Sequence, residues 1–188
     1  MNEQIKTTEK PKMTTQTIAL IAVMTAVTCV LAPFSLPIGP VPISLTNLTI
    51  YIGLYVLGMK KETISCAVYL IIGLAGVPVF SGFSGGPGKL IGPTGGYLIG
   101  FVPMAIVAGF FIDKFDGKRV PSILGMVIGT AICYTLGTAW FCIQADSQLV
   151  NALGLCVFPF LPGDAVKIVV AAVFGPQIQK TLRRLDLR

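Results

Sequence analysis

Six long apolar segments, separated by shorter polar or glycine-rich ones, constrain this chain more than any single motif does. They cover residues 14–32, 43–59, 62–76, 95–112, 121–141 and 164–182. A helix needs about 20 apolar residues to cross the hydrocarbon core of a bilayer, and each segment approaches that length. Only 12% of the residues are charged, against about 25% in soluble domains. The sequence therefore predicts an all-α membrane protein with six transmembrane helices in one domain, residues 14–182, flanked by tails at residues 1–13 and 183–188.

The basic residues predict how these helices cross the membrane. Six crossings place both tails and the loops after the second and fourth helices on one side. All 14 basic residues except Lys89 and Lys167 lie in or beside these segments. Because lysine and arginine concentrate on the cytoplasmic side of membrane proteins, we expect both tails in the cytoplasm. The net charge of +6 then reflects membrane orientation, and no basic–aromatic stripe indicates a nucleic-acid partner.

Asp164 and Lys167 form the first candidate site. They are three residues apart at the start of the sixth predicted helix, so they share one helix face. A charged side chain in a bilayer costs roughly 2.5–3.5 kcal/mol on insertion scales, so this pair indicates a binding site. The alternative is an interfacial ion pair that satisfies only itself, with Asp164 capping the helix.

A glycine-rich segment, residues 73–97, lies between the third and fourth predicted helices and holds nearly half of the 21 glycines. It is not a nucleotide-binding P-loop, because Phe83 replaces the first glycine of that motif and Leu90 follows the lysine. Non-helical backbone near membrane depth persists only where it is buried in protein or lines a cavity. We therefore expect an extracytoplasmic lid whose glycines, Gly92 among them, let the backbone approach a ligand. An ordinary outer loop is the alternative.

Other side chains could complete a pocket at this end of the bundle. Thr46 and Asn47 offer donors and acceptors, although hydrogen bonds between helices explain them nearly as well. Asn151 starts an apolar turn that leads to Pro162, so it could reach the same place. Tyr97, Tyr134 and Trp140 could form a wall, or they could belong to the aromatic belt at the membrane interface.

Small residues recur on two predicted helices, at Gly125, Gly129, Cys133 and Gly137 on the fifth and at Ala19, Ala22 and Ala26 on the first. Such stripes permit close helix approach, either within the bundle or with another subunit. The chain has no histidine, and its five cysteines are scattered singly. Neither a metal site nor a catalytic centre is therefore expected.

Three of these features together resemble a known family. They are the glycine-rich residues 81–97, the sequence Pro162-Gly163-Asp164-x-x-Lys167, and the alanine pair of the first helix. The chain resembles the BioY family, the biotin-binding S-components of energy-coupling factor (ECF) vitamin transporters, over residues 14–182. The resemblance implies six helices, two cytoplasmic termini and a place in the bacterial plasma membrane. It also implies high-affinity capture of biotin at the extracytoplasmic face for uptake, without a cofactor or enzymatic activity.

The resemblance also implies partners and contacts. A transmembrane coupling subunit would bind Ala22 and Ala26, with Ala19 less certain, and two ATPase subunits would hydrolyse ATP. Asp164, Lys167 and Asn151 are the implied polar ligand contacts. Asp164 would accept hydrogen bonds from the ureido N–H groups while Lys167 donates to the ureido oxygen, and the reverse pose places Lys167 on the valerate carboxylate. Phe83 and Tyr97 would pack against the fused rings.

Two other classes of function compete with this interpretation. A self-contained secondary transporter of a small vitamin-like solute would use Asp164 to couple uptake to an ion or proton. Inverted repeats would favour it, but residues 1–94 and 95–188 show no convincing match. An intramembrane enzyme would use Asp164 and Lys167 as acid and base, and the chain offers no further residues to support such chemistry.

Overall fold

The chain folds into a helical bundle with one very short hairpin. The structure, a computed structural model, describes residues 14–36 and 41–185. The predicted tail at residues 1–13 and the last three residues of the predicted C-terminal tail lie outside this part of the chain. The elements follow in the order α1 (Thr15–Leu31), β1 (Ser35–Leu36), β2 (Ile43–Ser44), α2 (Thr46–Leu57), α3 (Met59–Leu74), α4 (Pro87–Ile91), α5 (Gly95–Lys114), α6 (Arg119–Ala145), α7 (Leu149–Cys156) and α8 (Leu161–Arg184).

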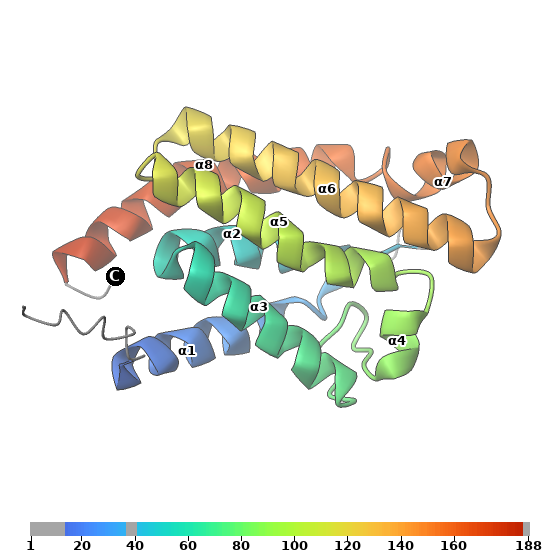
Figure 1. Ribbon diagram of the computed structural model, residues 1–188, viewed down its shortest axis with the longest axis horizontal. Helices are drawn as coiled ribbons and strands as arrows, with labels where there is room; N and C mark the ends of the chain where they lie inside the picture. Colours follow the sequence, from blue (N-terminus) through green and yellow to red (C-terminus); the bar gives the residue numbers. More distant parts are fainter. Residues whose placement is uncertain (1–13, 37–40, 186–188) are drawn as a thin grey trace, which may run out of the picture.

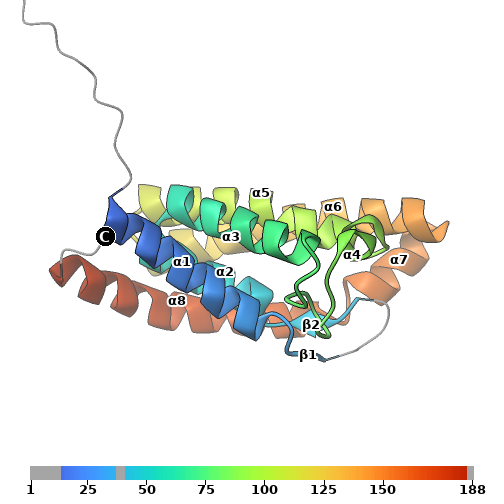
Figure 2. The ribbon, with the colours of Figure 1, turned by 90° about the horizontal axis from the view of Figure 1, so that it is seen from below.

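The longer helices form two layers (Figures 1 and 2). Helices α3, α5 and α6 lie in one layer, and α1, α2 and α8 lie in the other. Helix α2 packs against α1, α3, α5 and α8, and nine of its 12 residues are buried. A helix that is apolar on all sides belongs in a protein interior, which explains the central position of α2. The start of α1 and the end of α8 lie at one end of the bundle, and α4 and α7 lie at the other.

Glycines let α5 and α6 pack closely side by side. A Cβ atom at Gly129 would come within 2.9 Å of the Met104 carbonyl oxygen, and one at Gly137 would overlap the Tyr97 ring. Any larger residue at these positions would push the helices apart. The small-residue stripe of α6 therefore serves packing within the bundle. The alanines of α1 differ, because Ala19, Ala22 and Ala26 are all exposed.

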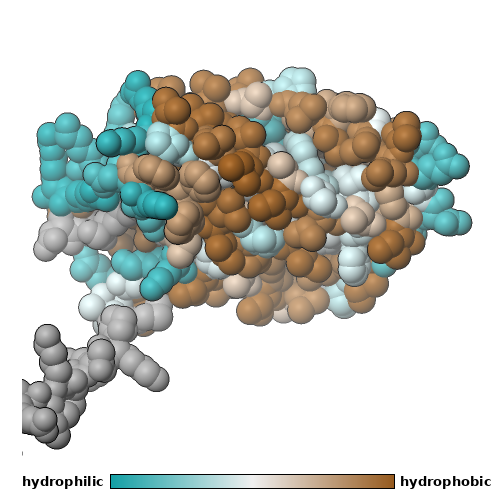
Figure 3. Space-filling model, turned by 45° about the horizontal axis from the view of Figure 1, so that its top comes forward, coloured by the Kyte–Doolittle hydropathy of each residue, from teal (hydrophilic) through white to brown (hydrophobic). Residues whose placement is uncertain are grey.

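Three helices in the described part of the chain are long and apolar enough to cross a membrane: α5, α6 and α8. Helices α1 and α2 are shorter apolar helices. Helix α3 has 16 residues and begins with Lys60, Lys61 and Glu62. Figure 3 shows a broad hydrophobic surface between two hydrophilic ends of the molecule. This pattern is that of a multi-pass membrane protein.

Several element boundaries differ from the sequence prediction. Helix α8 begins at Leu161 and not at Asp164, because Pro162 lies in the first helical turn, where its missing N–H costs no hydrogen bond. The glycine-rich segment contains the short helix α4, and its Pro87 takes the same kind of position. Helix α3 starts directly after α2, with only Gly58 between them, and the φ of +81° at Gly58 explains the glycine.

Candidate ligand-binding site

A cavity lies at the end of the bundle that carries α4 and α7. Its walls come from β2 and the residues before it, α2, the glycine-rich segment, α5, α6, α7 and α8. The space not filled by atoms is about 580 Å³, including the part that is open to solvent at the mouth. Most of the lining is apolar, and it includes several polar side chains.

Asp164 is the centre of the polar lining. Its Oδ1 accepts a hydrogen bond from Lys167 Nζ at 2.8 Å. Its Oδ2 accepts from Asn47 Nδ2 at 3.1 Å and from the Tyr134 hydroxyl at 2.6 Å. Asp164 is 5% exposed and Lys167 is 8% exposed, so the ion pair lies inside the protein. Helices α2, α6 and α8 thus each contribute to one buried polar cluster, which we call the Asp164 cluster (Asn47, Tyr134, Asp164 and Lys167).

The Asp164 cluster keeps capacity for further hydrogen bonds. A carboxylate can accept about four, and three protein donors occupy Asp164. The Lys167 ammonium has three N–H donors, of which one binds Asp164. Asn47 retains its amide oxygen as an acceptor. The cluster can therefore offer both donors and acceptors to a ligand in the cavity.

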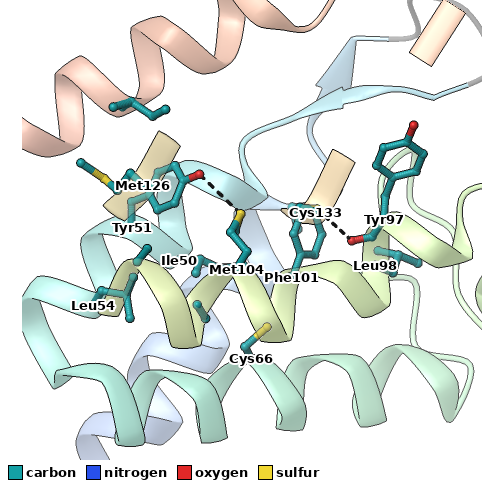
Figure 4. Packing of buried hydrophobic residues seen from close by; sticks show 14 of the residues in the cluster. Ile50, Tyr51, Leu54, Cys66, Tyr97, Leu98, Phe101, Met104, Met126 and Cys133 are labelled. Carbon is teal, nitrogen blue, oxygen red and sulfur yellow. Dashed lines mark hydrogen bonds between the residues drawn. The ribbon is translucent and has the colours of Figure 1, made fainter. Parts of the chain in front are cut away.

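Aromatic side chains form much of the apolar lining. Tyr97, Leu98 and Phe101 line the cavity from α5, and Phe160 lines it from the turn before α8. Figure 4 shows the side chains of the three α5 residues. The Tyr97 hydroxyl lies 2.9 Å from the Thr138 hydroxyl and donates to the Cys156 carbonyl at 3.4 Å. These bonds hold the ring against α6 and α7 and leave its apolar surface for packing.

Hydrogen bonds tie the glycine-rich segment to the rest of the protein near both of its ends. The Gly82 N–H donates to the Pro33 carbonyl at 3.0 Å, and the Phe34 and Phe83 rings meet edge to face beside it. At the other end of the segment, Trp140 Nε1 donates to the Gly92 carbonyl at 3.0 Å. Ser81 and Lys89 from this segment line the cavity.

Some sequence-predicted residues meet at the cavity and others lie elsewhere. Asp164, Lys167, Asn47 and Tyr97 line it. Thr46 is buried beside it, where its hydroxyl lies 2.8 Å from that of Ser44.

Three further predicted residues do not line the cavity. Phe83 is 63% exposed and borders an adjoining apolar groove, which Lys167 also lines. Gly92 contributes its carbonyl to Trp140, and Asn151 is exposed on α7.

Sequence reasoning missed or underrated three lining residues. The sequence suggests Tyr134 only as part of an aromatic wall, whereas in the structure its hydroxyl donates the shortest hydrogen bond of the Asp164 cluster. Lys89 could have been predicted as a site residue, because it and Lys167 are the two basic residues away from the predicted cytoplasmic side. Phe160 could not, because an aromatic residue in an apolar segment is ordinary.

Comparison with known protein families matches residues 3–184 to the BioY family. The chain belongs to the BioY family. One relative within it is the biotin transporter BioY of Thermotoga maritima, 37% identical over 158 residues that make up 84% of this chain and 92% of that protein. Another is the probable biotin transporter BioY of Pyrococcus horikoshii, 34% identical over 167 residues, or 89% of this chain and 98% of that protein.

The fold also matches a solved structure of the BioY type. The crystal structure of the S-component for biotin from an ECF-type ABC transporter superimposes with a TM-score of 0.81 and 31% sequence identity. The match covers 88% of this chain and 91% of that protein. The names of these BioY relatives describe transport and not catalysis.

Proposed function

We propose that this chain is the high-affinity biotin-binding subunit, the S-component, of an ECF-type importer. The names of the BioY relatives and of the matched S-component support biotin as the ligand. The observation that carries the proposal is the Asp164 cluster, which holds a buried ion pair in the wall of a mostly apolar cavity. Buried charges in a membrane protein are costly, and a polar guest beside them explains why they are kept.

The proposed topology has six crossings with both termini in the cytoplasm. Helices α1, α2 and α3 complete the count, and their modest lengths fit a bundle in which α2 is enclosed by its neighbours. Lys114, Lys118, Arg183 and Arg184 gather near the ends of α5 and α8, which become the cytoplasmic end. The cavity and the glycine-rich lid then face the extracytoplasmic side. A tag after Arg188 should react with membrane-impermeant reagents only in inside-out vesicles, and labelling in right-side-out cells would refute this orientation.

The chemistry of biotin suits the cavity. In the proposed pose, the ureido N–H groups donate to Asp164, and Lys167 donates to the ureido oxygen. Each hydrogen bond to a charged group contributes about 1.5–3 kcal/mol net. The fused rings pack against Tyr97, Phe101 and Phe160, and burial of their surface contributes about 25 cal/mol per Å².

Lys89 is the proposed partner of the valerate carboxylate, because it is the second cation in the lining and comes from the opposite wall, on α4. Asn151, which the family resemblance implied as a contact, receives no ligand contact in this pose because it is exposed on α7.

The proposed partners are a transmembrane coupling subunit and two ATPase subunits, which supply the energy for uptake. Ala19, Ala22 and Ala26 are exposed along one side of α1, where small side chains would let another helix approach closely. Next to these alanines on α1, the Thr25 hydroxyl lies 3.0 Å from that of Ser65 and attaches the helix to α3. The outward side of α1 is thus available to a partner.

Titration calorimetry of the purified chain with a panel of ligands tests the proposal. The panel contains biotin, biotin amide, which lacks the carboxylate charge, thiamine and riboflavin. We expect biotin to bind most tightly, biotin amide to bind more weakly because Lys89 loses its partner, and the other vitamins to give no heat. Tight binding of another vitamin, or no binding of biotin to a folded chain, would overturn the biotin assignment. Equal affinities for biotin and its amide would overturn only the role of Lys89.

A further inference from the structure

Helix α7 and the turn that follows it, residues 149–160, have two different faces. On the inner face, Ala152, Cys156 and Phe160 are buried, and the last two line the ligand cavity. The outer face exposes four large apolar side chains, Leu149, Val150, Leu155 and Phe158, and one polar side chain, Asn151. Val150 is 78% exposed. A set of apolar residues this dense on one short segment is unusual for a surface in contact with water.

Charge and continuity indicate what covers the outer face. No charged residue occurs between Asp146 and Asp164, whereas the polar residues Gln144, Asp146 and Gln148 precede α7. The exposed apolar side chains of α6 and α8 continue the same surface on either side, with Ile143 80% exposed and Val166 also exposed. The apolar belt of two spanning helices thus extends over α7. At eight residues, α7 is about 12 Å long, which is too short to cross a bilayer.

We propose that α7 lies in the membrane interface, with Leu149, Val150, Leu155 and Phe158 in contact with lipid. Helices that lie in the interface plane bury apolar side chains at the boundary between headgroups and acyl chains. That this is the outer leaflet rests on the proposed function, whereas the contact with lipid does not.

The position of α7 has a consequence for the cavity. Within the protein, α7 packs mainly against α6, and the Tyr97 hydroxyl donates to its Cys156 carbonyl. One helix therefore separates the ligand cavity from lipid, and the lipid supports that wall from behind.

Fluorescence quenching by brominated lipid tests the lipid contact. Trp140 is the only tryptophan, so Trp140→Phe provides a silent background for Val150→Trp, reconstituted in phosphatidylcholine vesicles. Bromine on the upper part of the acyl chain should reduce the emission about twofold, as interfacial depth requires, and bromine near the chain end should reduce it less. Leu136→Trp in the same background is the depth control, because Leu136 is exposed in the middle of α6, and it should show the opposite order.

Two results would overturn the proposal. The first is emission from Val150→Trp that no brominated lipid quenches but aqueous iodide does. The second is quenching that appears only when the protein is diluted to one chain per vesicle, which would mean that a second copy covers α7. Because Trp140 bonds the Gly92 carbonyl, Trp140→Phe is first checked by thermal unfolding. If that background fails to fold, Val150→Trp in the unaltered chain should add quenching beyond that of Trp140 alone.

The readout is independent of biotin. A chain that fails to bind biotin but shows quenching refutes the proposed function and leaves the membrane position of α7 intact. The opposite pair of results refutes only the position of α7.

Discussion

Asp164 is held by donors from three helices, and none of them would suffice alone. Lys167 on the same helix neutralises the carboxylate, while Asn47 and Tyr134 bring hydrogen bonds from α2 and α6. A buried ion pair stays charged only when such additional hydrogen bonds offset the loss of hydration. The same bonds fix the carboxylate in one orientation, which prepares it for a ligand.

Tyr134→Phe should lower the free energy of unfolding by about 1.5–3 kcal/mol, because it removes a hydrogen bond to a charged acceptor. Tyr69→Phe is the matched control, since the Tyr69 hydroxyl donates to the neutral Val79 carbonyl at 3.3 Å, and it should cost only about 0.5–1.5 kcal/mol. Thermal unfolding of both variants in detergent makes the comparison. If Tyr134→Phe lowered the stability no more than Tyr69→Phe, the hydrogen bond from Tyr134 to Asp164 would not be stronger than a neutral one.

Trp140→Phe should speed the dissociation of biotin several-fold, because it removes the hydrogen bond that ties Gly92 and the proposed lid to α6. A neutral hydrogen bond contributes about 0.5–1.5 kcal/mol, or roughly two- to tenfold in a rate. Chase of bound radiolabelled biotin measures this rate. A dissociation rate equal to that of the unaltered chain would show that this bond does not restrain the lid.

Of the three hydrogen bonds that hold Asp164, only the one from Lys167 could be predicted from the sequence, although Asn47 and Tyr134 were also expected near the pocket. Asp164 and Lys167 are three residues apart in one helix, so their contact follows from helical geometry. Asn47 and Tyr134 are 117 and 30 residues away from Asp164. Their contacts depend on how the helices are packed, and no local pattern in the chain contains that information.

At the scale of elements, the sequence predicts long helices well and short ones poorly. All six long helices coincide with predicted apolar segments, because apolar segments of this length are too long for β-strands. The five-residue α4 and the eight-residue α7 went unpredicted, since so few residues carry no clear helical period. Pro87 and Pro162 both lie in the first turn of a helix, where the missing N–H of proline costs no hydrogen bond.

Gly129→Leu should destabilise the bundle by about 1–3 kcal/mol or more, because overpacking forces α5 and α6 apart. Gly154→Leu on α7 is the matched control, because a Cβ atom at Gly154 would meet no other atom within 4 Å. That change should be neutral or slightly stabilising, since glycine is a poor helix former. Equal loss of thermal stability in both variants would contradict the close packing of α5 on α6.

At the scale of the whole molecule, the proposed ligand-binding and partner-binding surfaces lie on different parts of the protein. The cavity lies at the end with α4 and α7, whereas Arg183 and Asp116 form an ion pair at the opposite end. Ala22 and Ala26 lie on the outer side of α1 and do not line the cavity. Ligand binding and partner binding should therefore be separable by mutation.

Ala22→Leu and Ala26→Leu should leave biotin affinity unchanged and prevent co-purification with the coupling subunit, because a larger side chain blocks close helix approach. Ala131→Leu on the exposed side of α6 makes the same chemical change elsewhere and should preserve the complex. Stable complexes of both α1 variants would exclude this side of α1 as the partner surface.

Calorimetric titration of biotin into Asp164→Ala, Lys167→Ala and the double variant tests the central claim most directly. The double variant removes both charges, so it leaves no unpaired ion to unfold the protein. We predict that all three variants bind biotin at least about tenfold more weakly than the unaltered chain, as the loss of one charged hydrogen bond requires. Unchanged affinity in folded variants would contradict the claim that the Asp164 cluster holds the ligand.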